Sequence, residues 1–279
     1  MKRKRTFNKI EEQLLSIPTW RLITEVVIVL AATAILLEPN KQINPVKVVF
    51  DNAESIAIAS AVVLYFKEIP ERKKQKHYEA WQVIDNAKDI ETSYARRKAL
   101  EDLYQDGISF DSIDLSKAFL RNIDLSGANL FGANLSEAFL ERANFINADL
   151  FAANLNRAQL YHAKFDRAEL NGAQLNGAKL SGAQLNGAKL NGAKLIAAKL
   201  IGANLNAADL SGANLEEADL SGTKIKRANL FKANIRNIDW DDKTQWPEPS
   251  EVAKALNIPE ALKRQLGITD TIKTETTNF

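Results

Sequence analysis

The sequence predicts an all-β solenoid, a coil of short extended segments stacked on one another, with helical segments at both ends. Two observations predict it. Alanine and leucine recur every five residues over the middle of the chain, as in "NGAQLNGAKLSGAQLNGAKLNGAKL" from Asn171 to Leu195. Within each unit the Ala and the Leu lie two positions apart, which places both on one face of an extended segment.

The five-residue spacing excludes regular secondary structure. The central apolar residue of each unit falls on every fifth position from Phe110 to Trp240. On an α-helix each five-residue step rotates by about 140°, so these side chains would spiral around the helix. On a straight strand, successive central residues would point to opposite faces. The three residues between a Leu and the next Ala must therefore turn the chain, and small residues such as Gly127 and Gly172 suit that turn.

A chain that bends the same way at every unit forms a coil, and only stacking of coils buries its apolar interior. Four right-angle bends would close a coil of twenty residues, although the residues alone leave the number of sides open. Stacked at the spacing of hydrogen-bonded strands, the 27 central positions would form a rod about 30 Å long. The predicted core includes Leu125, Leu130, Leu150, Leu180, Leu200, Ala128 and Ala178.

The repeat resembles the pentapeptide-repeat family, whose motif is A-(D/N)-L-x-x. The stretches "GANLFGANLSEAFL", "GANLNAADLSGANLEEADL" and "KRANLFKANI" carry the resemblance. It covers about half of the chain, from Phe110 to Trp240, with departures at Ile108, Ile113, Ile123 and Thr223. The resemblance implies a right-handed quadrilateral β-helix, which supplies both the four sides and the hand.

Five segments are expected along the chain. A basic segment covers residues 1–19, and an apolar helical hairpin covers 20–66. Residues 67–105 form a basic linker with a capping helix, and this helix is expected to be a single one over Lys73–Gln105. The β-helix occupies 106–242, and short C-terminal capping helices with a polar tail occupy 243–279.

The hairpin is predicted to anchor the protein in a membrane. Its apolar stretches, Trp20–Leu37 and Val48–Phe66, are flanked on both outer sides by basic residues, which places both ends in the cytoplasm by the positive-inside rule. Against this, Glu25, Asp51 and Glu54 are costly in hydrocarbon. The expected location is the plasma or thylakoid membrane with the repeat domain facing the cytoplasm, as in the cyanobacterial members that the chain resembles. A soluble cytoplasmic hairpin and a cleaved signal are the alternatives.

The composition argues against an enzyme. The chain has no cysteine and only two histidines, His77 and His162, so thiolate chemistry is excluded and metal binding lacks its commonest ligand. No phosphate-binding loop, nucleophile elbow or metal-ligand spacing occurs. We therefore predict no catalytic residue, no cofactor and no metal, and we interpret His162 as a surface residue.

Outward side chains offer the candidate sites. With twenty residues per coil, Phe119 stacks on Phe139 and Phe131 stacks on Phe151, on opposite sides of the coil. Either pair could simply stabilise neighbouring coils, or it could be a docking patch for a protein partner, since exposed apolar clusters often mark interfaces.

Charge argues against nucleic acid as a partner. Residues 106–242 hold 15 basic and 16 acidic residues, and the lysines of the middle coils spread over three faces. A basic groove with aromatic stacking partners is therefore not expected. The family also includes proteins that shield DNA gyrase by imitating DNA, a role that requires a strongly acidic rod and is not expected here.

The sequence therefore predicts a non-catalytic, membrane-tethered protein-interaction scaffold. The alternative is a soluble regulator that binds one protein target through a face of the rod. The expected partners are a protein whose identity the sequence does not give and membrane lipid at residues 20–66. Nucleic acid and small-molecule ligands are not expected, and homo-oligomerisation is left open.

Overall fold

The computed structural model describes residues 53–86 and 94–269, together with a few isolated positions between 18 and 32. It has two compact units, Met1–Glu79 and Ala80–Phe279. The predicted segment 1–19 and most of the predicted hairpin therefore lie outside the described residues. Among the described positions there, Arg21 Nε lies 3.4 Å from Glu25 Oε1, as expected for residues one helical turn apart.

Helix α4 (Ala53–Asn86) passes without interruption through the predicted boundary between the hairpin and the basic linker. Ion pairs of Glu68 with Arg72 and of Glu71 with Lys74, at 2.6 and 2.7 Å, lie along its exposed surface. No helix among the described residues combines the length and the apolar content needed to cross a bilayer.

Within the single capping helix predicted over Lys73–Gln105, the structure describes the end of α4, up to Asn86, and a second helical segment, α5 (Tyr94–Gln105). Residues 87–93 between them lie outside the described residues, so one continuous helix stays a prediction.

Helix α5 and the last turns of α4 cover the apolar end of the first coil. Leu100 and Leu103 are fully buried there, and Trp81 meets Phe110 edge to face with ring centroids 6.2 Å apart. The Tyr104 hydroxyl donates to the Ser126 carbonyl. These contacts replace the neighbouring coil that the first coil lacks.

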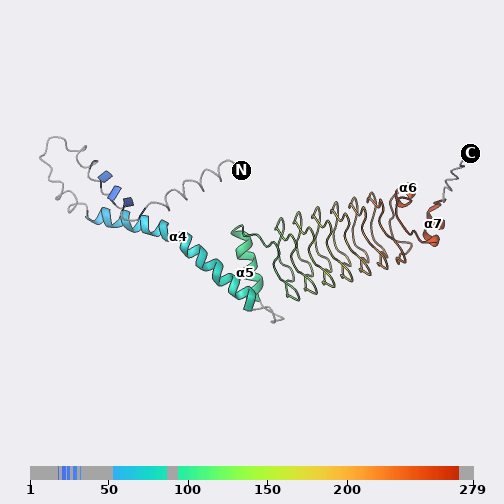
Figure 1. Cartoon of the computed structure of the whole chain (residues 1–279), viewed down its shortest axis with the longest axis horizontal. Coiled ribbons are helices and arrows are strands. Elements are labelled where there is room, and N and C mark those ends of the chain that lie inside the picture. The colour runs from blue at the N-terminus through green and yellow to red at the C-terminus, as the bar shows by residue number, and fades with distance from the viewer. Residues whose placement is uncertain are drawn as a thin grey trace, which may run out of the picture. The chain divides into compact units, whose positions relative to one another are not determined.

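The repeat region is a stack of coils (Figure 1). Parallel pairing recurs every twenty residues, from Asp114 with Asn134 to Asp219 with Asp239. Each coil therefore holds four five-residue units, one per side. The hydrogen bonds run between coils: Leu130 N donates to Asp149 O at 2.7 Å, and Asp149 N donates to Ala128 O at 2.9 Å. Each side is thus a short parallel sheet built from segments that pair at one central residue.

The corners between sides are tight turns. The residue three positions after each central Leu donates its N–H back to that Leu, as Ala128 N does to Leu125 O at 3.1 Å. The second turn residue, which is every fifth residue from Ser112 to Asn237, has a positive φ, as in a type II turn.

Small residues were predicted at these corners, and that prediction is only partly right. Gly127 has φ 74°, but long side chains adopt the same conformation, as at Arg157 with φ 57° and Glu217 with φ 58°. The backbone hydrogen bonds to neighbouring coils impose the left-handed conformation whichever residue occupies the corner.

The interior is packed with the Ala and Leu of each unit. All seven core residues predicted from the sequence are at most 2% exposed: Leu125, Leu130, Leu150, Leu180, Leu200, Ala128 and Ala178. Phe145 and Phe165 replace Leu on one side, and their rings stack inside the coil 5.0 Å apart. Thr223 is also buried, and its hydroxyl donates to Leu200 O at 2.8 Å, which satisfies the one polar group it brings into the core.

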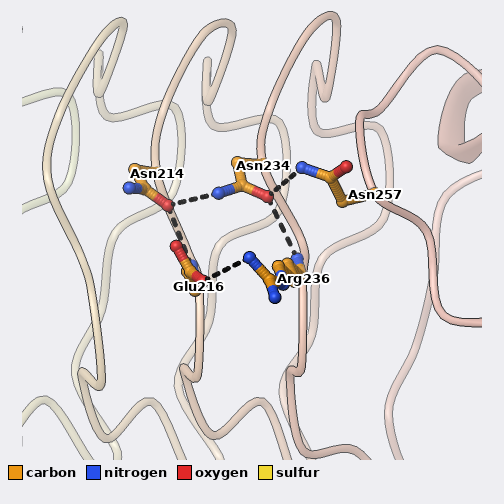
Figure 2. Close-up of polar contacts among 5 residues, drawn as sticks. All are labelled: Asn214, Glu216, Asn234, Arg236 and Asn257. Atoms are coloured by element: carbon orange, nitrogen blue, oxygen red, sulfur yellow. Dashed lines mark hydrogen bonds and ion pairs between the residues drawn. The ribbon is translucent and has the colours of Figure 1, made fainter.

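The C-terminal segment closes the other end of the stack. It contains helix α6 (Pro249–Val252) and helix α7 (Glu260–Leu266), which ends at Gly267 with φ 67°. Leu256 pairs with Asn234 as a residue of a further coil would. Beside it, Asn257 Nδ2 donates to Asn234 Oδ1 at 2.9 Å, and Asn234 Nδ2 donates to Asn214 Oδ1 at 2.9 Å (Figure 2).

Candidate interaction surface

Where the motif position holds Asp or Asn, that side chain caps the following turn at nearly every corner. Its side-chain oxygen accepts the backbone N–H two residues later, as Asn134 Oδ1 does from Ser136 at 3.2 Å and Asp209 Oδ1 does from Ser211 at 3.0 Å. The N–H concerned lies at the first turn position, where no backbone carbonyl of a neighbouring coil accepts it. The side chain of the motif residue therefore stabilises the turn and has a structural role.

In the middle coils, the N–H at the first turn position is capped by a different residue. There Gln or Lys occupies the motif position, and an Asn of the preceding coil caps the N–H instead. Asn176 N donates to Asn156 Oδ1 at 2.9 Å, and Ile196 N donates to Asn176 Oδ1 at 3.1 Å. In and around the Asn171–Leu195 stretch, asparagine side chains of one coil thus cap backbone N–H groups of the next coil. Sequence reasoning missed this role, although the recurrence of Asn twenty residues apart is a readable signal.

The two predicted aromatic pairs both form, but their surroundings differ. Phe119 and Phe139 stack with centroids 4.0 Å apart, and both rings are half-buried. Phe131 and Phe151 stack in parallel planes with centroids 5.5 Å apart, and these residues are 47% and 44% exposed. Only the second pair presents a large apolar surface to solvent.

The exposed pair lies on a corner that carries no charge over several coils. Between Phe131 and Gly212 the turn positions of this corner are occupied by Phe, Ala, Asn, Gly and Ser alone. The backbone N–H groups of the two phenylalanines are capped by Asn129 Oδ1 and Asp149 Oδ1, at 3.1 and 3.0 Å. The rings therefore stand on a fixed backbone, beside turn positions that carry no charge.

A shallow open groove lies at another corner, lined by Arg121, Asn122, Glu141, Arg142, Tyr161 and His162. Arg121 and Glu141 form a bidentate ion pair with both N–O distances at 2.9 Å, and these hydrogen bonds raise the pKa of Arg121 above its ordinary value. His162 is exposed at a corner with φ 57°, as a surface residue should be.

The groove contains no nucleophile beside a base. Within the part of the chain that the structure describes, no three His, Asp or Glu side chains lie close enough together to hold a metal ion. We therefore assign no chemistry to this groove.

The geometry defines the class of this protein as a four-sided parallel β-solenoid with five residues per side. The family model described as "Pentapeptide repeats" matches eight copies, within residues 108–145, 123–158, 143–182, 153–192 and 198–237. Over these residues the chain matches the pentapeptide-repeat family, whose members fold as right-handed quadrilateral β-helices.

Several solved structures are similar to the repeat domain. HetL, a pentapeptide repeat protein involved in heterocyst differentiation regulation from the cyanobacterium Nostoc sp. strain PCC 7120, is 26% identical, over 57% of this chain and 92% of its own, with a TM-score of 0.27. Rfr23 from the cyanobacterium Cyanothece 51142 is 28% identical over 53% of this chain and 96% of its own, with a TM-score of 0.22.

QnrB1, a plasmid-mediated fluoroquinolone resistance protein, is 20% identical over 57% of this chain and 85% of its own, with a TM-score of 0.34. No curated protein matches the chain.

Proposed function

We propose that the repeat domain is a non-catalytic protein-interaction scaffold, and that a protein partner docks on the corner that carries Phe131 and Phe151. The observation that carries the proposal is the exposure of this stacked pair, 47% and 44%, on a backbone that hydrogen bonds hold rigid. Rigid aromatic side chains are the usual anchors of protein interfaces, because they bury much area and lose little entropy on binding.

The competing interpretation is that the pair only ties two coils together. An aromatic stack contributes about 0.5–1.5 kcal/mol beyond burial, and this pair is already half in water. On the docking proposal, the double variant Phe131→Ser with Phe151→Ser loses little stability but loses its partner.

The matched control is Phe119→Ser with Phe139→Ser, which removes the other stacked pair from a different side of the coil. Each variant and the wild-type protein would be used as bait in native cells, and co-purified proteins would be compared after the melting temperature of each bait is measured. We expect a partner retained by the wild type and by the control and lost from the Phe131/Phe151 variant. A large fall in melting temperature with unchanged co-purification would support the purely structural interpretation.

The location of this scaffold stays a prediction, and so does the alternative of a soluble regulator. The basic residues on both sides of 20–66 motivate the tether to a cytoplasmic membrane face. Alkaline carbonate washing of membranes tests it: a tethered chain stays in the pellet, and a chain truncated before Lys73 becomes soluble. Release of the full-length chain by carbonate would contradict the tether.

A further inference from the structure

The middle coils contain four Asn–Gly sequences, at Asn171, Asn176, Asn186 and Asn191. Asn–Gly is a reactive sequence because glycine leaves its backbone nitrogen unhindered. That nitrogen, after losing its proton, can attack the side-chain Cγ of the Asn. A C–N bond forms, the side-chain amide leaves as ammonia, and water then opens the cyclic imide to aspartate or isoaspartate. The reaction needs only water.

The folded coil restrains this reaction at all four places. The glycine N–H donates to the next coil in every case, at distances of 2.8–3.0 Å: Gly172 to Asn191 O, Gly177 to Ile196 O, Gly187 to Asn206 O and Gly192 to Ser211 O. Attack therefore requires the coil to open locally and that hydrogen bond to break.

The side chains are not held equally. Asn171 Oδ1 and Asn176 Oδ1 each accept a backbone N–H of the next coil, at 3.2 and 3.1 Å. Asn186 donates both its backbone N–H and its Nδ2 to the Asp166 carboxylate, at 3.1 and 2.6 Å. These contacts fix three of the four side-chain amides within the stack.

Asn191 differs in both exposure and partners. It is the only exposed asparagine of the four, and its side chain is held by one neutral hydrogen bond, from Nδ2 to Ser211 Oγ at 2.7 Å. Its side-chain oxygen caps no backbone N–H, because Ser211 N is capped by Asp209 at 3.0 Å. The free-energy cost of releasing the Asn191 side-chain amide from its contacts is therefore lower than at the other three asparagines.

We propose that Asn191–Gly192 is the site of spontaneous deamidation in the folded protein, and that the coil protects the other three Asn–Gly sequences until it unfolds. Conversion at Asn191 places a carboxylate on the corner that is uncharged from Phe131 to Gly212. Conversion to isoaspartate also lengthens the backbone of a five-residue unit by one methylene, which the stacking register cannot absorb without local distortion.

Trypsin cleavage separates the competing sites. Peptide 190–194 contains Asn191 alone, 180–189 contains Asn186, and 168–179 contains Asn171 and Asn176. The full-length protein would be incubated in mildly alkaline buffer, folded or in denaturant, and the mass gain of each peptide followed with time. In the folded protein we expect 190–194 to convert at least about tenfold faster than the others. In denaturant we expect the three peptides to convert at similar rates per Asn–Gly sequence.

Gly192→Ala is the matched variant. A Cβ at position 192 would meet no atom within 4 Å, so the fold tolerates it at some cost from φ 66°, whereas the methyl group hinders ring closure. We expect it to slow conversion at Asn191 and to leave the other peptides unchanged. The proposal is overturned if 168–179 or 180–189 converts as fast as 190–194 in the folded wild-type protein. It is equally overturned if 190–194 stays unconverted while folded but converts in denaturant.

Discussion

At the scale of the residue, each position of the five-residue unit has one physical task. The Ala and the Leu fill the interior, the Asp or Asn between them caps the following turn, and the second turn residue adopts a left-handed conformation. Only the two turn positions and the motif position reach solvent, so the sequence can vary there without loss of the fold. Inward and outward positions therefore tolerate substitution very differently.

Two residues that are adjacent in sequence, one facing inward and one facing outward, test this difference in tolerance. Leu180 is fully buried and Lys179 is exposed. Leu180→Asp places an ion in a core with no polar partner, so we expect a loss of several kcal/mol or failure to fold. Lys179→Ala should change the free energy of unfolding by less than about 0.5 kcal/mol. Urea unfolding of both variants measures the difference, and equal effects would refute the inward and outward assignment.

Much of this residue-level organisation could be predicted from the sequence. Burial of the central Leu followed from the spacing, and the pairing of Phe131 with Phe151 followed from counting twenty residues. The left-handed Arg157 and Glu217 could not be predicted, because residue type disfavours that conformation and only the hydrogen bonds between coils impose it. The greater exposure of Phe131 relative to Phe119 likewise depends on its place on a corner.

At the scale of the element, the ends of the coil decide whether the repeat is stable, because the terminal coils lack a neighbour. Helix α5 covers the first coil with Leu100 and Leu103, and Leu256 and Asn257 continue the pairing beyond Asn234. Caps at both ends were predicted from the sequence. The pairing of Leu256 with Asn234 could not be predicted, because it depends on a segment outside the repeat.

The C-terminal cap should be sensitive to acid. Asp241 Oδ1 accepts the Gly222 N–H at 2.7 Å, and bonds from Thr244 and Lys243 add to it, so the pKa of Asp241 lies below its ordinary value of 3.8. A carboxyl group with a lowered folded pKa stabilises the fold above its unfolded pKa, and this stabilisation is lost as the pH falls through the folded pKa.

We therefore expect the cap to weaken below about pH 4, where the unfolded carboxyl group begins to take up its proton. Asp241→Asn should remove this part of the pH dependence and lower stability at neutral pH. Hydrogen exchange at the Gly222 amide, followed against pH, measures it. Identical pH profiles of the wild type and the variant would show that Asp241 does not hold the cap.

At the scale of the whole molecule, the central claim is that residues twenty apart are neighbours and that the resulting columns define the surface of the repeat domain. The docking corner at Phe131 and Phe151, the caps at the corners and the protection of the Asn–Gly sequences all depend on this period. The chain has no native cysteine, so disulfides introduced at chosen positions can report it directly.

Gln159 and Lys179 are paired in adjacent coils. Strands that pair lie about 4.8 Å apart, within the Cα separation of about 4.4–6.8 Å that a disulfide spans. The double variant Gln159→Cys with Lys179→Cys should form an intramolecular disulfide under mild oxidation and keep the wild-type circular dichroism spectrum. Gln159→Cys with Gln174→Cys, fifteen residues apart and on different sides of the coil, should remain reduced. If the second pair closes as readily as the first, or if the first pair does not close, the twenty-residue coil is wrong.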